Sequence, residues 1–180
     1  SPCTQNKDDY DGSFLYLMDA EGGEPQALGV EGYDPAWSPD GSRIATTVMD
    51  GGFRPQIYLY DLATGSYGNL SNSSGQEFMP AWSADGNFIA YVSTSSGQRQ
   101  IFTMDLNGEN KRFFSRSNER SNAYPSWTPN GLAIAFVGRR MSDEIDIYYV
   151  WLRAGDEDKS SRERRLEQAI EKIEKARKTA

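Results

Sequence analysis

Residues 34–41 read DPAWSPDG, and two related octapeptides follow at residues 79–86 (MPAWSADG) and 124–131 (YPSWTPNG). A tryptophan occupies the fourth position of each copy, and its successive occurrences lie 45 residues apart: Trp37, Trp82 and Trp127. Copies at a fixed spacing of this size predict a repeat architecture, in which each repeat forms one supersecondary unit.

Each octapeptide is followed by two short apolar runs. The first run opens with Ile-Ala and ends in Val, at residues 44–48, 89–92 and 134–137, and the second covers residues 57–62, 101–106 and 147–152. Runs of this length that are rich in Ile, Val, Tyr and Phe and bounded by Gly, Pro, Asn, Asp and Ser favour strands. Residues 89–92 (IAYV) are apolar on both faces, which predicts strands that lie between two neighbouring sheets.

The end of each octapeptide has the residues of a tight turn. In the first copy Pro39 presets φ, and Gly41 can adopt a positive φ, so the chain can reverse from one strand into the next. The later copies keep this chemistry in ADG and PNG. We therefore interpret Asp40, Asp85 and Asn130 as turn residues, and Asp61 and Asp105 as residues that end strands by bonding to local backbone.

A period of 40 to 45 residues with four strands per repeat is typical of a β-propeller blade. The motif PxWSPDGxxIA followed by IYxxD resembles the WD40-like (PD40) repeats of the TolB-like propeller family, over residues 14–152. The resemblance implies a six-bladed ring, exported bacterial proteins and binding of partner proteins. The predicted fold is all-β, with four-stranded antiparallel blades in an incomplete ring of about three blades, plus a C-terminal α-helix.

The repeat also predicts the domain boundaries. An N-terminal tail at residues 1–13 precedes the blades at 14–152, and the helix occupies 156–180. The blades themselves comprise a partial blade at 14–28 and blades at 34–70, 79–115 and 124–152. Propellers close with roughly four to eight blades, so an open stack of three exposes apolar faces. We expect closure from the rest of a longer polypeptide, or from another chain such as a second copy.

Residues 156–180 have a different composition. Ser160 and Glu163 have the spacing of a capping box, and apolar residues follow at helical spacing on one stripe. This amphipathic stripe is a candidate partner-binding surface and contains Leu166, Ile170 and Ile173. The stripe could pack on the propeller edge of its own chain or on another molecule, or the segment could be a disordered tail.

Charge argues against a nucleic-acid partner. The chain has 26 acids and 19 bases, of which 7 acids and 8 bases lie in residues 156–180, so the body is strongly acidic. An acidic surface repels phosphate backbones. No apolar run approaches the roughly 20 residues that span a bilayer, so we expect no membrane span.

Catalysis has little support in the composition. The sequence contains no histidine, which removes Ser-His-Asp and Cys-His arrangements within this chain as well as histidine-ligated metals. No phosphate-binding Gly-rich loop is present, and we predict no cofactor. The three tryptophans are interpreted as core wedges between blades, because they repeat at one blade position.

These observations predict a noncatalytic protein-binding or assembly module, which completes its ring or docks its helix through another chain. Two alternatives stay open: an accessory propeller domain of a larger exported enzyme such as a serine peptidase, and a structural subunit of a multiprotein complex. The resemblance implies a periplasmic or extracellular location. Cys3, the only cysteine, is either a lipoprotein attachment point or a free thiol.

Overall fold

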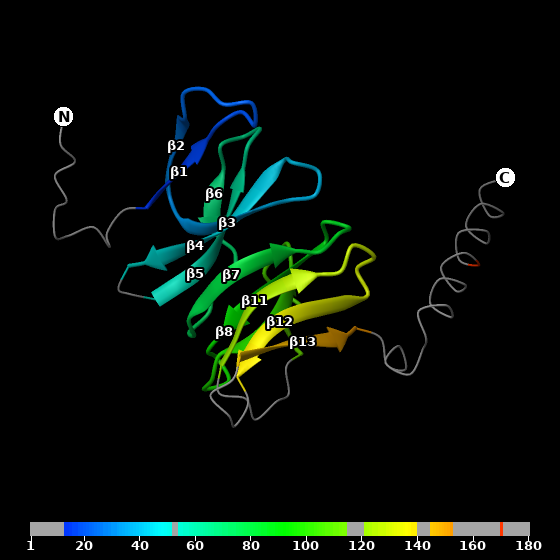
Figure 1. The fold of residues 1–180 in the computed structure, drawn as a ribbon. Coiled ribbons are helices and arrows are strands. Elements are labelled where there is room, and N and C mark those ends of the chain that lie inside the picture. Colours follow the sequence, from blue (N-terminus) through cyan, green and yellow to red (C-terminus); the bar gives the residue numbers. More distant parts are fainter. Residues whose placement is uncertain (1–12, 52–53, 115–120, 140–144, 153–169, 171–180) are drawn as a thin grey trace.

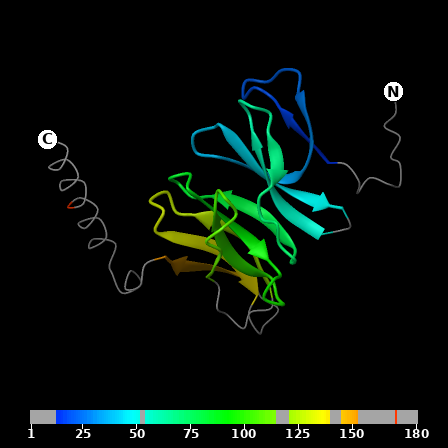
Figure 2. The same ribbon diagram turned by 180° about the vertical axis from the view of Figure 1, so that it is seen from behind.

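The computed structural model describes residues 13–51, 54–114, 121–139, 145–152 and 170, and its strands form four antiparallel sheets (Figure 1). The N-terminal sheet pairs β1 (Phe14–Leu17) with β2 (Gln26–Glu31). The sheets that follow are called the first, second and third blades, and they stack in sequence order, as the reverse view also shows (Figure 2). The all-β prediction is confirmed.

The first blade has the strand order β3 (Tyr33–Trp37), β4 (Arg43–Asp50), β5 (Arg54–Asp61) and β6 (Tyr67–Asn69). The second blade repeats this order with β7 (Glu77–Trp82), β8 (Phe88–Ser93), β9 (Gln100–Asp105) and β10 (Arg112–Phe113). The third blade has three strands in the described residues, β11 (Ser121–Trp127), β12 (Ala133–Arg139) and β13 (Ile145–Trp151). Ile170 is helical, and the rest of the predicted helix at 156–180 lies outside the described residues.

The turn after each inner strand forms as its residues predict. Gly41, Gly86 and Gly131 have φ of 69°, 72° and 68°, and each N–H donates to the carbonyl three residues earlier, at 2.8–3.0 Å. A side chain at positive φ is strained, so glycine suits these positions. Three equal turns place β4, β8 and β12 antiparallel to the inner strands β3, β7 and β11.

Each inner strand contains a bulge that the sequence did not predict. The residue before its proline has positive φ, 52° at Asp34, 57° at Met79 and 52° at Tyr124, and the strand register shifts there. A residue before proline is biased towards extended conformations, so the sequence favoured a regular strand. The bulge adds a residue and bends the strand, and its threefold recurrence makes it a feature of the blade.

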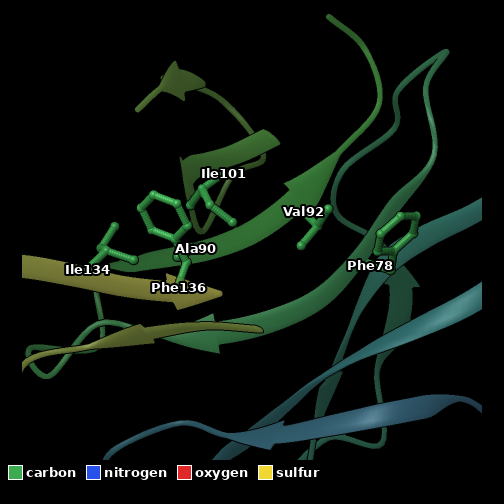
Figure 3. Close-up of a cluster of buried hydrophobic side chains, with 6 residues drawn as sticks. All are labelled: Phe78, Ala90, Val92, Ile101, Ile134 and Phe136. Carbon is green, nitrogen blue, oxygen red and sulfur yellow. The ribbon is translucent and has the colours of Figure 1, made fainter. Parts of the chain in front are cut away.

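Three apolar clusters fill the junctions between successive sheets. The junction of the second and third blades is drawn in Figure 3, where Ile101 of the second blade lies beside Ile134 and Phe136 of the third. Phe78 belongs to the same cluster and lies further away, on the side of Val92. The strands are covered on both faces: the consecutive residues Ile89 and Ala90 are both fully buried, yet they belong to different clusters. The prediction of strands that lie between two sheets is confirmed for the second blade.

Ile101 tests how much a junction stabilises the chain. We expect Ile101→Ala to lower the free energy of unfolding by about 2–5 kcal/mol, because it removes buried methyl groups and leaves a cavity between blades. Ile145→Ala is the matched control, since Ile145 is 63% exposed, and should cost under about 0.5 kcal/mol. Urea unfolding followed by tryptophan fluorescence measures both. If Ile101→Ala and Ile145→Ala lowered the free energy of unfolding equally, the junction between the blades would not be the core.

Candidate functional site

The two junctions between successive blades contain the same hydrogen bond. The indole N–H of Trp82 donates to the carbonyl of Ala36 at 2.9 Å, and that of Trp127 donates to the carbonyl of Ala81 at 3.0 Å. Both tryptophans pack against the apolar cluster of their junction. The second and third blades therefore each present a tryptophan on the face that meets the blade before them.

The interpretation of the tryptophans as core wedges is confirmed for Trp82 and Trp127 and is wrong for Trp37, which is 52% exposed. The N-terminal sheet explains the difference. Its two strands cover Ile44 and Tyr60 of the first blade through a cluster around Leu15. Trp37 does not belong to this cluster and stays exposed.

No strand in the described part of the chain packs on the far face of the third blade. Ile57 lies opposite Thr47 in the first blade and Ile101 opposite Val92 in the second, and both isoleucines are 0% exposed. Ile147 takes the same place in the third blade, opposite Val137, and is 80% exposed. We call the exposed side chains of β13 the open face: Ile145, Ile147 and Tyr149.

The open face has two properties of a protein-binding surface. Its apolar side chains alternate along β13, so they project from one side of the sheet. In the described residues β13 is also the edge strand of its sheet, whereas β6 and β10 flank the equivalent strands β5 and β9. Contiguous exposed apolar groups and an unpaired strand edge both favour association with another polypeptide.

A polar position beside each junction recurs in the three blades. Gln56 and Gln100 occupy it in β5 and β9, opposite Val48 and Ser93, and Asp146 occupies it in β13, opposite Gly138. Each glutamine bonds to the segment that enters the next blade. The Gln56 amide N–H donates to the carbonyl of Gly75 at 2.8 Å, and the Gln100 side-chain oxygen accepts from Asn122 at 2.8 Å.

Glu77 begins the inner strand of the second blade and is buried. Its Oε1 accepts hydrogen bonds from the hydroxyls of Ser73 (2.6 Å) and Ser93 (3.0 Å), while its Oε2 has no partner in the described part of the chain. Burial raises the pKa of Glu77, although the two hydroxyls and the nearby charge of Lys111 oppose the rise. The sequence analysis missed this residue, since nothing near it in the chain distinguishes it from an exposed acid.

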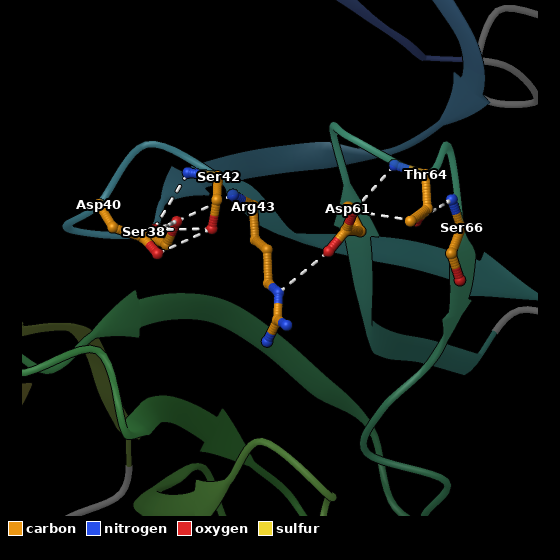
Figure 4. A network of polar contacts seen from close by, with 7 residues as sticks. All are labelled: Ser38, Asp40, Ser42, Arg43, Asp61, Thr64 and Ser66. Carbon is orange, nitrogen blue, oxygen red and sulfur yellow. Dashed lines mark hydrogen bonds and ion pairs between the residues drawn. The ribbon is translucent and has the colours of Figure 1, made fainter.

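The acids of the turns are occupied by local hydrogen bonds (Figure 4). Asp40 accepts from the Ser38 hydroxyl at 2.6 Å and from the backbone N–H and hydroxyl of Ser42 at 3.0 and 2.8 Å. These bonds, the one from the Ser38 side chain foremost, lower the pKa of Asp40 to about 2. The interpretation as a turn residue is confirmed. Asp85 and Asn130 hold the matching turns by accepting from Ser83 and Thr128.

Asp61 and Asp105 also serve the local backbone. Asp61 accepts from the N–H and hydroxyl of Thr64, and its second oxygen lies 3.3 Å from Nε of Arg43 (Figure 4). The Thr64 bonds, with a smaller part from Arg43, lower the pKa of Asp61. Asp105 accepts from the backbone N–H groups of Asn107 and Glu109. Both acids are the last residues of their strands and bond to local backbone, as predicted.

A cavity of about 890 Å³ lies between the second and third blades at the end where these turns are found. Its charged lining groups are Asp85 and Arg112, and aromatic rings such as Trp127 form part of its wall. The carboxylate of Asp85 is already bonded to Ser83 and Asn87. Its pKa is lowered by those bonds against the effect of burial, so it is no proton donor at neutral pH.

The predicted helix stripe is only partly described. Ile170 is helical and exposed, while Leu166 and Ile173 lie outside the described residues. Their partner-binding role stays a prediction. Among the residues that the structure describes, no three His, Cys, Asp or Glu side chains gather as metal ligands, and no helix is long and apolar enough to cross a membrane.

The blades are antiparallel sheets that pack face to face, and an indole N–H of a tryptophan donates to a backbone carbonyl at both blade junctions. These features define the chain as part of a β-propeller. Residues 13–164 match PD40, the TolB beta propeller domain, and the chain belongs to this family. It is 38% identical over 146 residues to the Tol-Pal system protein TolB of Bordetella pertussis, covering 79% of this chain and 33% of the relative. The chain therefore spans about a third of that relative.

Solved structures show the same fold. TolB from Acinetobacter baumannii superposes with a TM-score of 0.67 at 26% identity, over 79% of this chain and 36% of that one. A putative TolB from Agrobacterium tumefaciens gives 0.70 at 22% identity, over 82% and 56% of the two chains. A prolyl endopeptidase gives 0.57 at 15% identity, over 81% and 26%, which shows the fold alone.

The buried Glu77 predicts a pH-dependent stability. A carboxyl group whose pKa is raised by folding contributes stability that is complete below its ordinary value of 4.5 and is lost as the pH rises through the raised value. Glutamine cannot ionise. The unfolding free energy of wild type minus that of Glu77→Gln should therefore fall as the pH rises from 4 towards neutrality, as urea unfolding at several pH values will measure. A difference that is constant, or that grows with pH, would contradict the assignment.

Proposed function

We propose that the chain is a noncatalytic protein-binding or assembly module that completes its propeller through another chain at the open face, or docks its C-terminal helix on one. The observation that carries this proposal is Ile147, which is 80% exposed where its counterparts Ile57 and Ile101 are 0% exposed. The same position of the repeat is thus buried in two blades and exposed to solvent in the third.

The free energy available at the open face supports binding. Covering an exposed isoleucine or tyrosine side chain completely contributes about 1.5–3 kcal/mol, as an upper estimate. The open face carries two isoleucines and a tyrosine, and Trp151 lies edge-on to Tyr149 with ring centroids 5.7 Å apart. A partner that covers these groups therefore gains several kcal/mol before its entropy of association is subtracted.

The family supports the same role and suggests where it is exercised. The curated relatives are named Tol-Pal system proteins, and we propose by extension that this chain works within a protein assembly. We also propose a periplasmic or extracellular location, which rests on that relationship. The accessory domain of a larger exported enzyme has weaker support, because the likeness to a prolyl endopeptidase extends to the fold alone.

Capture of partners from a periplasmic extract of the source organism tests this function. We expect the immobilised wild-type chain to retain a protein whose recovery falls about tenfold or more with Ile147→Asp, since a central apolar anchor commonly contributes over 1.4 kcal/mol to binding. Phe14→Asp is the matched control, because Phe14 is 51% exposed on the N-terminal sheet. Ile170→Asp separates docking by the helix from docking at the open face.

Mass spectrometry identifies the captured protein, and light scattering reports whether the chain also associates with itself. If all four proteins capture the same set and the chain is monomeric, the assembly role is wrong. Loss of capture with Phe14→Asp as well would show that the variants disturb the fold rather than one surface.

A further inference from the structure

We propose that the cavity between the second and third blades binds a small organic acid, whose carboxylate pairs with Arg112 and whose apolar body lies against Trp127. Both residues line this cavity, which is separate from the open face, so the inference goes beyond the proposed function. The volume of about 890 Å³ falls within the range of roughly 300–1,000 Å³ that small-molecule sites occupy.

The cavity lies where the second and third blades meet differently from the first and second. We call these contacts the second junction and the first junction. In the first junction Leu59 and Leu70 pack against the apolar cluster. In the second, Thr103 takes the place of Leu59 in the strand register, and Phe114 takes that of Leu70, because both N–H groups donate to equivalent isoleucine carbonyls. Phe114 is not among the apolar residues of the cluster in its junction, so the second junction is packed less fully at these positions.

Arg112 is the charge that this difference adds. It lies opposite Thr103, at the place where the first blade has Gly68 opposite Leu59. In the described part of the chain no carboxylate lies within ion-pair distance of its guanidinium. A guanidinium can bind a carboxylate through two parallel hydrogen bonds, so an arginine in the wall of a cavity favours anions over neutral molecules.

The other charged group of the lining, Asp85, does not reverse this preference. It has a counterpart in Asp40 of the first blade and is bonded within its own turn to Ser83 and Asn87. That turn joins β7 to β8, whereas Arg112 is in β10, beyond β9. Two strand spacings separate the backbones by about 10 Å, and exposed charges at that distance are largely screened at physiological ionic strength. The carboxylate of a ligand therefore binds at the Arg112 end.

Apolar walls are available for the rest of the ligand. Phe88 of the second blade and Trp127 and Leu152 of the third line the cavity. Phe88 stands where the first blade has Arg43, the partner of Asp61, and its ring is 40% exposed. A charged side chain of the first junction is thus replaced by an aromatic ring in the second, and covering that ring is favourable.

The sequence argues against closing the second junction as the first is closed. In the first junction Gly108 of the second blade has a φ of 76°, and a Cβ on it would lie 2.1 Å from the carbonyl oxygen of Leu70. The repeat places Ala154, which lies outside the described residues, at the position of Gly108. A residue with a Cβ cannot make this close contact without strain.

Two matched probes test the site: phenylbutyrate, which is an anion at neutral pH, and its neutral amide. Trp82 and Trp127 make the same indole bond, one in each junction, so their indole N–H resonances in an NMR correlation spectrum report the junctions separately. We expect phenylbutyrate to shift the Trp127 resonance with a dissociation constant on the order of 1 mM, and the amide to bind about tenfold more weakly. The resonances of Trp82 and of the exposed Trp37 should not move.

Three variants assign the binding to the cavity. Arg112→Gln should remove the preference for the acid and leave the affinity for the amide unchanged, because only the charge is lost. Arg54→Gln is the matched control, since Arg54 is an exposed arginine at the start of β5, and it should change neither affinity. Thr103→Leu combined with Arg112→Gly gives the second junction the residues of the first and should weaken both probes about tenfold or more. Urea unfolding shows whether this double variant keeps its fold.

The inference is overturned if phenylbutyrate leaves the Trp127 resonance of the wild-type chain in place, which is also the result if the segment after Leu152 fills the cavity. It is equally overturned if the preference for the acid survives Arg112→Gln, or if a folded double variant binds as well as wild type. Equal shifts at Trp37, Trp127 and Trp151 would show adventitious binding to exposed rings and overturn it too. None of these results affects partner capture through Ile147, so the proposed function and this inference fail separately.

Discussion

Each interior sheet of this protein must be covered on both of its faces, and the rest of the structure depends on that constraint. Ile89 and Ala90 are neighbours in β8, point to opposite faces and are both fully buried, one against the first blade and the other against the third. A single blade cannot bury its own apolar groups, because a four-stranded sheet has no second layer. The stack is therefore the unit of stability, and each blade contributes half of every junction it joins.

Polar groups set the geometry within which this apolar contact forms. The Asp-Gly turns fix the connection between inner and second strands, and the acids in them are bonded to the turn itself. The indole bonds from Trp82 and Trp127 then set the distance between consecutive inner strands. Apolar contact alone has no direction, so these bonds supply the alignment of one blade on the next.

The sequence predicted the features that repeat within one blade. Strand runs, turn glycines and the period were readable because they depend on neighbouring residues. It did not predict the positive φ of Met79, because a residue before proline is biased towards extended conformations. It also did not predict the burial of Glu77, whose hydroxyl partners lie 4 and 16 residues away in the sequence. The exposure of Trp37 was missed for a related reason: its environment is determined by a sheet that covers only part of its face.

The candidate site could not be predicted from the repeat pattern either. Ile57, Ile101 and Ile147 are one residue type at one position of the repeat, so no pattern in the sequence separates the third from the other two. What the sequence does record is the change beside it, from Gln56 and Gln100 to Asp146. In a repeat protein the residues that recur in every copy encode the core, so information about a partner lies where one copy departs from the others. Asp146 is such a departure, and in β13 it stands between Ile145 and Ile147 of the open face.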